Sequence, residues 1–314
     1  MLRLKLKIDK VLNYSKQKET LLVKQVVITI LIVMSMLILT ACNSESASQP
    51  TIPSEAEKNE PSKNVQEQNS ETEEFIEEKK PKVEEDELKE EVEEVSAAYQ
   101  VSDDSSIIPI KDEINEDVVL LTFDDAPDKY SLQIAETLKS LDASAIFFVN
   151  GHFINSPEGK EQLKKIHDMG FLIGNHTYNH PLLTTISEEK QKEEIVSLNN
   201  RIEEIIGERP KFFRAPNGVN TDYSKQVVKE EGMVLMNWTY GYDYFEPYMD
   251  KDKLTTAMIT GEGPEVDVSY SLLKPGANLL MHDREWTAAA LADIIKGLRE
   301  SGYEVVDPNL ILTN

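Results

Sequence analysis

The sequence predicts an α/β domain with a parallel sheet, and two observations lead to this fold class. From Val118 to the C-terminus, short apolar runs alternate with longer amphipathic stretches. Repeated strand and helix units of this kind form parallel strands joined by right-handed crossovers, either in a βα barrel or in an open doubly wound sheet. Several of the apolar runs end in polar residues that can carry chemistry, as they do at the carboxyl ends of strands in both architectures.

The individual elements follow from the period of the apolar residues. The pattern predicts strands at 118–123, 145–149, 172–174, 212–213, 234–238, 278–281 and 303–306, and helices at 131–141, 160–169, 188–206 and 287–301. Gly170 ends the second helix. Ser187 caps the third helix, and the acidic residues over 188–194 load its first turns with the negative charge that the helix dipole favours.

The first 42 residues have the layout of an export signal. A basic stretch is followed by an uncharged apolar run over 26–39, which is short for a membrane span. The run ends at Leu39–Cys42, which resembles the lipobox of bacterial lipoproteins, where small residues precede a cysteine that is lipidated. Cys42 is the only cysteine, so it has no intramolecular disulfide partner. The sequence therefore predicts a signal peptide over 1–42 and a lipid anchor on the outer face of a cell membrane. An uncleaved signal anchor with a free thiol is the alternative.

Residues 43–116 are strongly acidic. They hold 23 Asp and Glu against 7 Lys, with few apolar residues between them. Such a composition cannot bury enough apolar surface to offset the chain entropy lost on folding. The segment is therefore predicted to be a disordered, self-repelling tether, with a transient polar helix possible over 71–95. The net charge of −24 for the whole chain argues against a nucleic-acid partner.

Two adjacent carboxylates end the first predicted strand. Asp124 and Asp125 follow the apolar run 118–121 and precede Ala126 and Pro127. Adjacent residues of an extended segment point in opposite directions, so such a pair can serve a metal and a proton separately. Taken alone, the same residues also suit an ordinary solvated turn.

Two histidines lie four residues apart after another predicted strand. His176 and His180 fall on one face if the segment begins a helix or a tight turn, and imidazole pairs at this spacing bind zinc and similar metals. Two surface histidines in a polar loop are the simpler alternative. Of the other histidines, His167 is expected on a helix surface, and His152 in a turn.

An arginine and a further histidine also end predicted strands. Arg214 follows Phe213 and is able to hold a carboxylate through two parallel hydrogen bonds, with a Pro and a Gly bending the backbone after it. His282 directly follows the apolar run expected to form a strand over 278–281, and Asp243 follows the strand expected over 234–238. Each has a structural alternative, as an ordinary turn or as a residue that caps a strand against solvent.

Four motifs together resemble those of the NodB-homology polysaccharide deacetylases, the family-4 carbohydrate esterases. They appear in the family's order across residues 118–306, as TFDD at 122–125, HTxxH at 176–180, RxPxG at 214–218 and LxHD at 280–283. The resemblance implies a distorted (β/α) barrel of the NodB-homology type over a domain at 117–314. An ordered set of motifs is far more specific than any single one.

The resemblance also implies a metal centre. Asp125, His176 and His180 would bind a divalent metal, with zinc expected and cobalt, nickel or manganese as other candidates. The backbone amide of Asn217 would stabilise the oxyanion, and Leu280 would help to form the pocket for the acetyl methyl group.

Three further residues take catalytic roles under the same resemblance. Asp124 would be the general base, Arg214 its orienting partner and His282 the general acid. Hydrolysis of an N-acetyl group requires such a set, because water must lose a proton as it attacks and the departing amine must gain one.

Three positions depart from the family pattern. Ala126 stands where glycine is usual, and Asn217 replaces the common aromatic residue, which leaves the backbone amide but alters the sugar contact. The aspartate that tunes the acid histidine is assigned to Asp243 only by its approximate placement near Trp238.

The expected function is therefore metal-dependent removal of N-acetyl groups from a cell-wall or extracellular polysaccharide, with GlcNAc of peptidoglycan as the substrate. The chain is expected to act as a monomer held at the membrane through lipidated Cys42. One alternative is a catalytically idle glycan-binding lipoprotein. Another is a deacetylase of chitin oligomers or poly-N-acetylglucosamine, or an esterase for an O-acetylated glycan.

Overall fold

The computed structural model describes residues 96–313. The predicted signal peptide, Cys42 and most of the acidic tether lie outside these residues. Within the described range, no helix combines the length and the apolar character that a membrane crossing needs.

A seven-stranded parallel sheet forms the centre of the domain. Its order is β7–β6–β5–β4–β3–β8, and β9 pairs with the first residues of β3. The strands are β3 (Val118–Ala126), β4 (Ile146–Val149), β5 (Leu172–Asn175), β6 (Phe212–Phe213), β7 (Val234–Leu235), β8 (Ala277–His282) and β9 (Glu304–Val305). Every pairing in this sheet is parallel, as the alternation of strands and helices predicts.

The chain that follows β7 brings the two sides of the sheet together. Met236 donates its N–H to the carbonyl of Phe213 at 3.0 Å and so continues the pairing of β7 with β6. A few residues later, Tyr240 bridges to Leu279 of β8, and the Leu280 N–H donates to the Tyr240 carbonyl at 2.9 Å. The sheet therefore curls into a distorted barrel, and the prediction of this architecture over an open sheet is confirmed.

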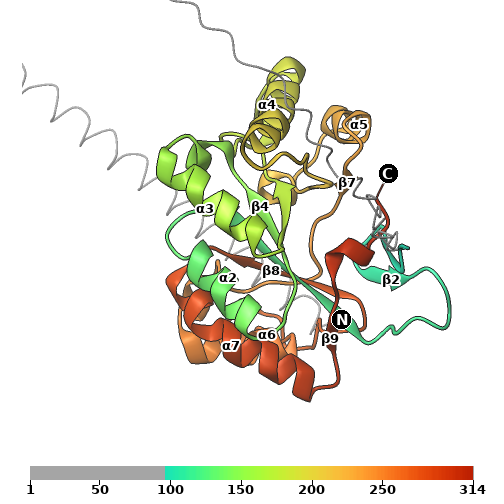
Figure 1. Cartoon of the computed structure of the whole chain (residues 1–314). Helices are drawn as coiled ribbons and strands as arrows, with labels where there is room; N and C mark the ends of the chain where they lie inside the picture. The colour runs from blue at the N-terminus through green and yellow to red at the C-terminus, as the bar shows by residue number, and fades with distance from the viewer. Residues whose placement is uncertain (1–95, 314) are drawn as a thin grey trace, which may run out of the picture. The chain divides into compact units, whose positions relative to one another are not determined.

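Helices pack around the curled sheet (Figure 1). They are α2 (Ser131–Ser140), α3 (Pro157–Asp168), α4 (Glu188–Ile206), α5 (Asp222–Glu230), α6 (Lys251–Thr260) and α7 (Glu285–Glu300). Single 3₁₀ turns lie at Gly151–Ile154, Leu183–Thr185, Pro216–Gly218, Glu246–Tyr248, Pro264–Val266 and Pro308–Leu310. Figure 1 shows α2, α6 and α7 on one side of the domain, with α4 and α5 next to each other elsewhere.

Three helices, α3, α5 and α6, differ most from the sequence prediction. Helix α3 begins three residues earlier than expected, because the Ser156 hydroxyl accepts from the Gly159 N–H and Pro157 suits the first helical position. The pattern of apolar residues did not predict α5 or α6. Helix α5 is nine residues long and is held by a capping box at Thr221, so local hydrogen bonds define it more than apolar spacing does.

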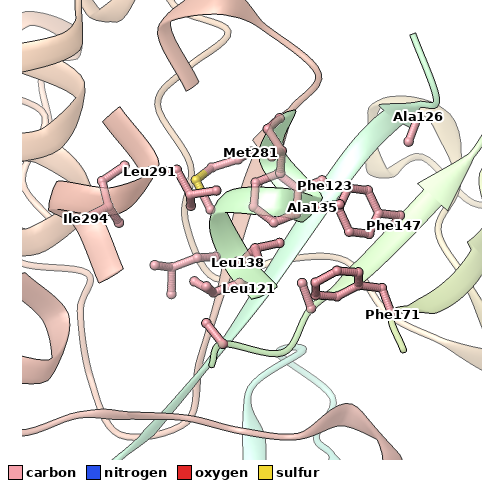
Figure 2. Close-up of a cluster of buried hydrophobic side chains, with 14 of the residues drawn as sticks. Leu121, Phe123, Ala126, Ala135, Leu138, Phe147, Phe171, Met281, Leu291 and Ile294 are labelled. Carbon is pink, nitrogen blue, oxygen red and sulfur yellow. The ribbon is translucent and has the colours of Figure 1, made fainter. Parts of the chain in front are cut away.

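The long strand β3 separates two apolar clusters by the alternation of its side chains. Leu121 and Phe123 face the helices, where Phe123 stacks on Phe147 with ring centroids 5.3 Å apart (Figure 2). Leu120 faces the inside of the curled sheet and packs there with Phe148. Both faces of β3 are buried, as expected for a parallel strand, and this makes the position of its carboxyl end rigid.

The predicted start of the domain at residue 117 is too late. Residues 96–116 include a short antiparallel hairpin of β1 (Tyr99–Val101) and β2 (Ile107–Pro109). Tyr99 and Ile107 are buried in the cluster inside the sheet, and the Ile107 N–H donates to the Gly276 carbonyl at 2.7 Å. The acidic composition averaged over 43–116 hid the apolar residues at the end of that segment.

Candidate active site

A cleft of about 330 Å³ opens at the carboxyl ends of the strands. It is lined by Asp124, Asp125, His176, His180, Asn217, Trp238, Tyr244, Leu280, His282 and Arg284. Residues that are far apart in the sequence thus meet at one edge of the sheet, as the strand-end positions predict. Arg214 and Asp243 are fully buried and contact residues of the cleft from behind.

The two carboxylates of β3 have different partners. Asp124 continues the alternation of the strand and points into the sheet interior, where it is 2% exposed. The pairing of β3 with β4 then shifts register between Phe123 and Ala126, and Asp125 has a left-handed φ of 61°. Non-glycine residues rarely adopt this backbone conformation, and they do so mostly where the surrounding structure enforces it. The irregularity turns the Asp125 carboxylate toward the cleft.

Arg214 is a fully buried cation that holds Asp124. Its Nη1 donates to the Asp124 Oδ1 at 2.7 Å and to the Thr122 hydroxyl at 2.8 Å. The remaining N–H groups reach the carbonyls of Met236 and Asn237, at 3.4 and 2.6 Å, and the Asn278 side chain at 3.4 Å. All five donors of the guanidinium therefore have acceptors. Burial lowers the pKa of Arg214, and the Asp124 charge opposes that effect.

The two predicted histidines come together without a helix. They lie in an irregular loop after β5, and their ring centroids are 4.9 Å apart. His176 is buried, and its Nδ1 lies 2.7 Å from the Arg214 carbonyl. Because a carbonyl can only accept, Nδ1 carries the proton and Nε2 has a free lone pair. Burial lowers the pKa of His176, which favours the neutral imidazole that a metal requires.

Asp125, His176 and His180 form a candidate metal centre. One possible ligand atom from each residue lies within 4.8 Å of the others. The Asp125 Oδ1 is 3.5 Å from the His180 Nε2. Two imidazoles and one carboxylate suit zinc and related divalent ions, and the hydrogen bond from His176 Nδ1 to a carbonyl is the support that metal-binding histidines usually have. The residues present therefore fit such an ion.

Arg284 is a cleft residue that the motifs did not indicate. Its Nη2 donates to the Asp125 Oδ2 at 2.9 Å, and its Nη1 donates to the Asp283 carbonyl at 3.0 Å. Burial raises the pKa of Asp125, but the positive charges near it, first that of His282 and also that of Arg284, hold it below the ordinary value. Asp125 is therefore ionised at neutral pH and has one oxygen directed to His180. Sequence reasoning could have found Arg284 only from its place next to the LxHD motif.

His282 and Asp243 form a hydrogen-bonded pair. The His282 Nδ1 lies 2.8 Å from the Asp243 Oδ1, and the His282 main-chain N–H donates to the Asp243 Oδ2 at 2.6 Å. Thr287 also donates to Oδ2, at 2.7 Å. Burial lowers the pKa of His282, but the Asp243 charge and hydrogen bond outweigh it and raise the pKa to about 9. Asp243 does not end a strand, because β7 stops at Leu235, yet it does contact His282 as the approximate motif placement suggested.

Asn217 occupies an unusual backbone position in the cleft wall. Its φ is 56°, in the left-handed region that asparagine tolerates better than most residues. Within residues 96–313, no protein group accepts a hydrogen bond from its main-chain N–H. Leu280 lines the same cleft and is 2% exposed. The site therefore combines a free backbone donor with an apolar wall.

Asp283, the last residue of the LxHD motif, stabilises the turn that follows the two carboxylates of β3. Its carboxylate accepts main-chain N–H groups of Asp128, Tyr130 and Ser131 at 2.7–2.9 Å, and the Ser131 hydroxyl at 2.5 Å. These groups lie at the start of α2, which has no side-chain cap of its own. Asp283 thereby links the end of β8 to the turn after β3. The prediction gave this residue no role, because its partners lie far away in the sequence.

His152 and His167 do not line the cleft. His152 lies in the 3₁₀ turn after β4, and its Nδ1 is 3.2 Å from the Tyr178 carbonyl. His167 lies on α3 near Asp168 and Glu208, with ion-pair distances of 3.7 and 3.6 Å. Both lie in the kind of structure that the sequence predicted for them.

Comparisons with known proteins agree with this geometry. A family model described as polysaccharide deacetylase matches residues 111–236. A peptidoglycan-N-acetylglucosamine deacetylase of Bacillus cereus is 32% identical over 207 residues, which cover 63% of this chain and 89% of that protein. The peptidoglycan-N-acetylmuramic acid deacetylase PdaA of Bacillus subtilis is 29% identical over 192 residues, covering 60% of this chain and 68% of that protein.

Solved structures share the fold. The peptidoglycan deacetylase PdaC of Bacillus subtilis superposes with a TM-score of 0.53 at 29% identity, covering 62% of this chain and 90% of that chain. A variant of BA3943, described as a family-4 carbohydrate esterase pseudoenzyme with restored enzymatic activity, gives a TM-score of 0.53 at 30% identity. That match covers 60% of this chain and 65% of the other, so the chain spans just under two thirds of that structure. The wild-type BA3943 is from Bacillus anthracis. From its motifs, its curled parallel sheet and these relatives, the chain belongs to the polysaccharide deacetylases of the NodB-homology type, carbohydrate esterase family 4.

Proposed function

We propose that the protein hydrolyses N-acetyl groups of a cell-wall polysaccharide and releases acetate, with GlcNAc of peptidoglycan as the substrate. The observation that carries this proposal is the convergence of Asp124, His282 and the three candidate metal ligands in one cleft. Family membership alone does not decide catalysis, since relatives include a protein described as a pseudoenzyme.

Asp125, His176 and His180 would hold a divalent ion, with zinc as the first candidate. When bound, such an ion lowers the pKa of a water molecule and polarises the acetyl carbonyl. Asp125 can offer Oδ1 while Arg284 occupies Oδ2 at 2.9 Å. The chain thus supplies one carboxylate oxygen and two imidazole nitrogens, and solvent can reach them through the cleft.

Different residues accept and donate the protons in this reaction. Asp124 accepts a proton from the attacking water, while Arg214 holds its Oδ1 and fixes its orientation. His282, held protonated by Asp243, donates its proton to the nitrogen as the carbon–nitrogen bond breaks. The Asn217 N–H donates to the carbonyl oxygen as negative charge develops there. Water and the amide thereby give acetate and a free amine.

The placement of the protein is part of the proposal. Lipidated Cys42 would anchor the chain to the outer face of the cell membrane, and residues 43–95 would separate the domain from that surface. Two similar proteins are named as peptidoglycan deacetylases, which supports a wall polymer as substrate. We further propose that the enzyme acts as a monomer and has no nucleic-acid partner, in keeping with its net charge of −24.

The direct test is acetate release by the full-length chain. We expect release from peptidoglycan that a chelator abolishes and added zinc or cobalt restores, with less release from chitin oligomers. If acetate is released only from chitin oligomers or poly-N-acetylglucosamine, the proposed substrate is wrong but the proposed deacetylation stands. Binding to these glycans with no acetate from any of them, in the presence of each metal, would instead identify an idle glycan-binding protein.

Replacing Asp243 by asparagine is expected to shift the alkaline limb of the pH profile of kcat/KM. His282 must be protonated to act as an acid, and its pKa of about 9 depends on the Asp243 charge. Without that charge, burial dominates and the pKa falls to or below the ordinary value of about 6.5, so activity is lost at lower pH. We expect the limb to move down by about two pH units.

The matched control for this pH profile is Thr287→Val. It removes one hydrogen bond to the Asp243 Oδ2 but leaves the carboxylate in place, so its limb should move little. A bound divalent ion affects the pKa of His282 equally in the wild type, Asp243→Asn and Thr287→Val. The measurement therefore compares the alkaline limbs of the three pH profiles with one another. An unchanged limb in Asp243→Asn would exclude His282 as the acid that this limb reports.

A further inference from the structure

The loop at 176–180, which carries two candidate metal ligands, is held from two sides. On one side, the Asn150 side chain donates to the first carbonyl of the loop at 2.7 Å, and the His152 N–H donates to the Tyr178 carbonyl at 2.9 Å. On the other side, the Tyr178 N–H donates to the Glu194 carbonyl of helix α4 at 3.0 Å. The loop therefore depends on hydrogen bonds to neighbouring elements and not on any regular structure of its own.

The Glu194 side chain adds a second and closer attachment. Its Oε2 accepts from the Asn179 main-chain N–H at 2.6 Å, and its Oε1 accepts from the Asn179 Nδ2 at 2.7 Å. Both oxygens of one carboxylate thus hold the residue that directly precedes His180. Hydrogen bonds to a charged acceptor are stronger than neutral ones, and a pair of them fixes orientation as well as distance.

His180 needs this attachment more than His176 does. His176 is buried and is fixed by its bond to the Arg214 carbonyl. The His180 side chain is 34% exposed, and within residues 96–313 no protein group hydrogen-bonds to its main chain. Its φ of 56° is in the left-handed region, which non-glycine residues keep only when their surroundings impose it. The last fixed point before His180 is Asn179.

We propose that Glu194 is a positioning residue for the metal centre, which holds His180 in place through Asn179 and thereby sets the affinity for the ion. The inference rests on the proposed function, because it takes His180 as a ligand. Two effects of removing Glu194 have the same sign. The loss of its hydrogen bonds frees His180, and the loss of its negative charge makes the neighbourhood less favourable to a cation.

The test is zinc binding by the metal-free, full-length chain, measured by competition with a chromophoric chelator. We expect Glu194→Ala to weaken binding about 10- to 100-fold, the range found for groups that orient metal ligands. Glu194→Gln keeps an acceptor for the Asn179 N–H, so its zinc affinity should lie between those of the wild type and Glu194→Ala. The matched control is Glu193→Ala, since the exposed Glu193 on the same helical turn pairs with Lys190 at 2.6 Å and should bind zinc as the wild type does.

A second readout separates positioning from a general loss of structure. Glu194→Ala should need more zinc for half-maximal acetate release, yet recover most of the wild-type kcat when zinc is saturating. If circular dichroism shows that Glu194→Ala is unfolded, Asn179→Ala is compared with the wild type instead. This variant loses only the hydrogen bond from Nδ2 to Glu194 and should bind zinc severalfold more weakly than the wild type.

His176→Ala serves as the reference for the site itself. If it abolishes zinc binding while folded Glu194→Ala binds zinc like the wild type, the inference about Glu194 is wrong and the proposed metal centre remains. If His176→Ala binds zinc as tightly as the wild type, the metal centre and the proposed function both fail.

Discussion

Replacing Asp124 by asparagine is expected to reduce acetate release by about 10³-fold, within the range that general acid–base catalysis contributes. Asparagine has the same shape and still accepts a hydrogen bond from Arg214, but it cannot take a proton from water. Because Asp124 is not one of the three proposed ligands, zinc affinity should change far less than kcat. The measurement is a single-substrate time course of acetate release, together with zinc titration of the same preparation.

Asp103→Asn provides the control for this experiment. Asp103 is an exposed carboxylate on the loop between β1 and β2, with no contact to the cleft, so its replacement should leave both quantities unchanged. If Asp124→Asn keeps more than about a hundredth of the activity, a different group must accept the proton, since loss of the base should cost at least about 10²-fold.

Replacing Arg214 by methionine is expected to cost about 3–5 kcal/mol of unfolding free energy, because it leaves the buried Asp124 without its counter-charge. The guanidinium also joins three parts of the sheet. It bonds to Thr122 on β3, to Asn278 on β8 and to the carbonyls of Met236 and Asn237 on the closing segment. Urea unfolding of the metal-free protein, followed by circular dichroism, measures the loss.

Two comparisons make the Arg214 result specific. Arg201→Ala removes an arginine of α4 whose partner, Glu204, is exposed, so the loss of this ion pair should change stability by less than about 1 kcal/mol. The double variant Arg214→Met with Asp124→Asn should be more stable than Arg214→Met alone, because it no longer buries an unpaired charge. Equal stability of Arg214→Met and Arg201→Ala would contradict the structural role given to Arg214.

Much of the fold could be predicted because the strands are strongly apolar. The runs at 118–123 and 145–149 are buried on both faces, so their sequence signal is continuous, and the structure has strands at both places. The closing stretch at 234–238 gives a weaker signal, because only Val234 and Leu235 pair as a strand before the chain crosses to β8. Helices α5 and α6 are short and polar, and their stability comes from caps and tertiary contacts that periodicity does not show.

The residues of the cleft were predictable where chemistry and strand ends coincide. Asp124, His176 and His282 lie at or just after buried strands, so their meeting at one sheet edge follows from topology. The contacts of Arg284 and Glu194 could not be predicted in this way. Arg284 reaches Asp125 across 159 residues of sequence, and Glu194 lies inside a helix whose acidic residues all look alike in the sequence.

The place of β3 in the sheet has a consequence for the order in which the protein can fold. Its neighbours on the two sides are β4, which follows soon after it, and β8, which begins only at Ala277. Bringing β8 to β3 closes a very long loop, which costs entropy and slows folding. A nascent chain that ends before Ala277 already contains Asp124, Asp125 and Arg214, but it lacks the strand that completes the cleft and the Asp283 carboxylate that holds the start of α2. Folding of the active site must therefore wait until synthesis has passed Asp283.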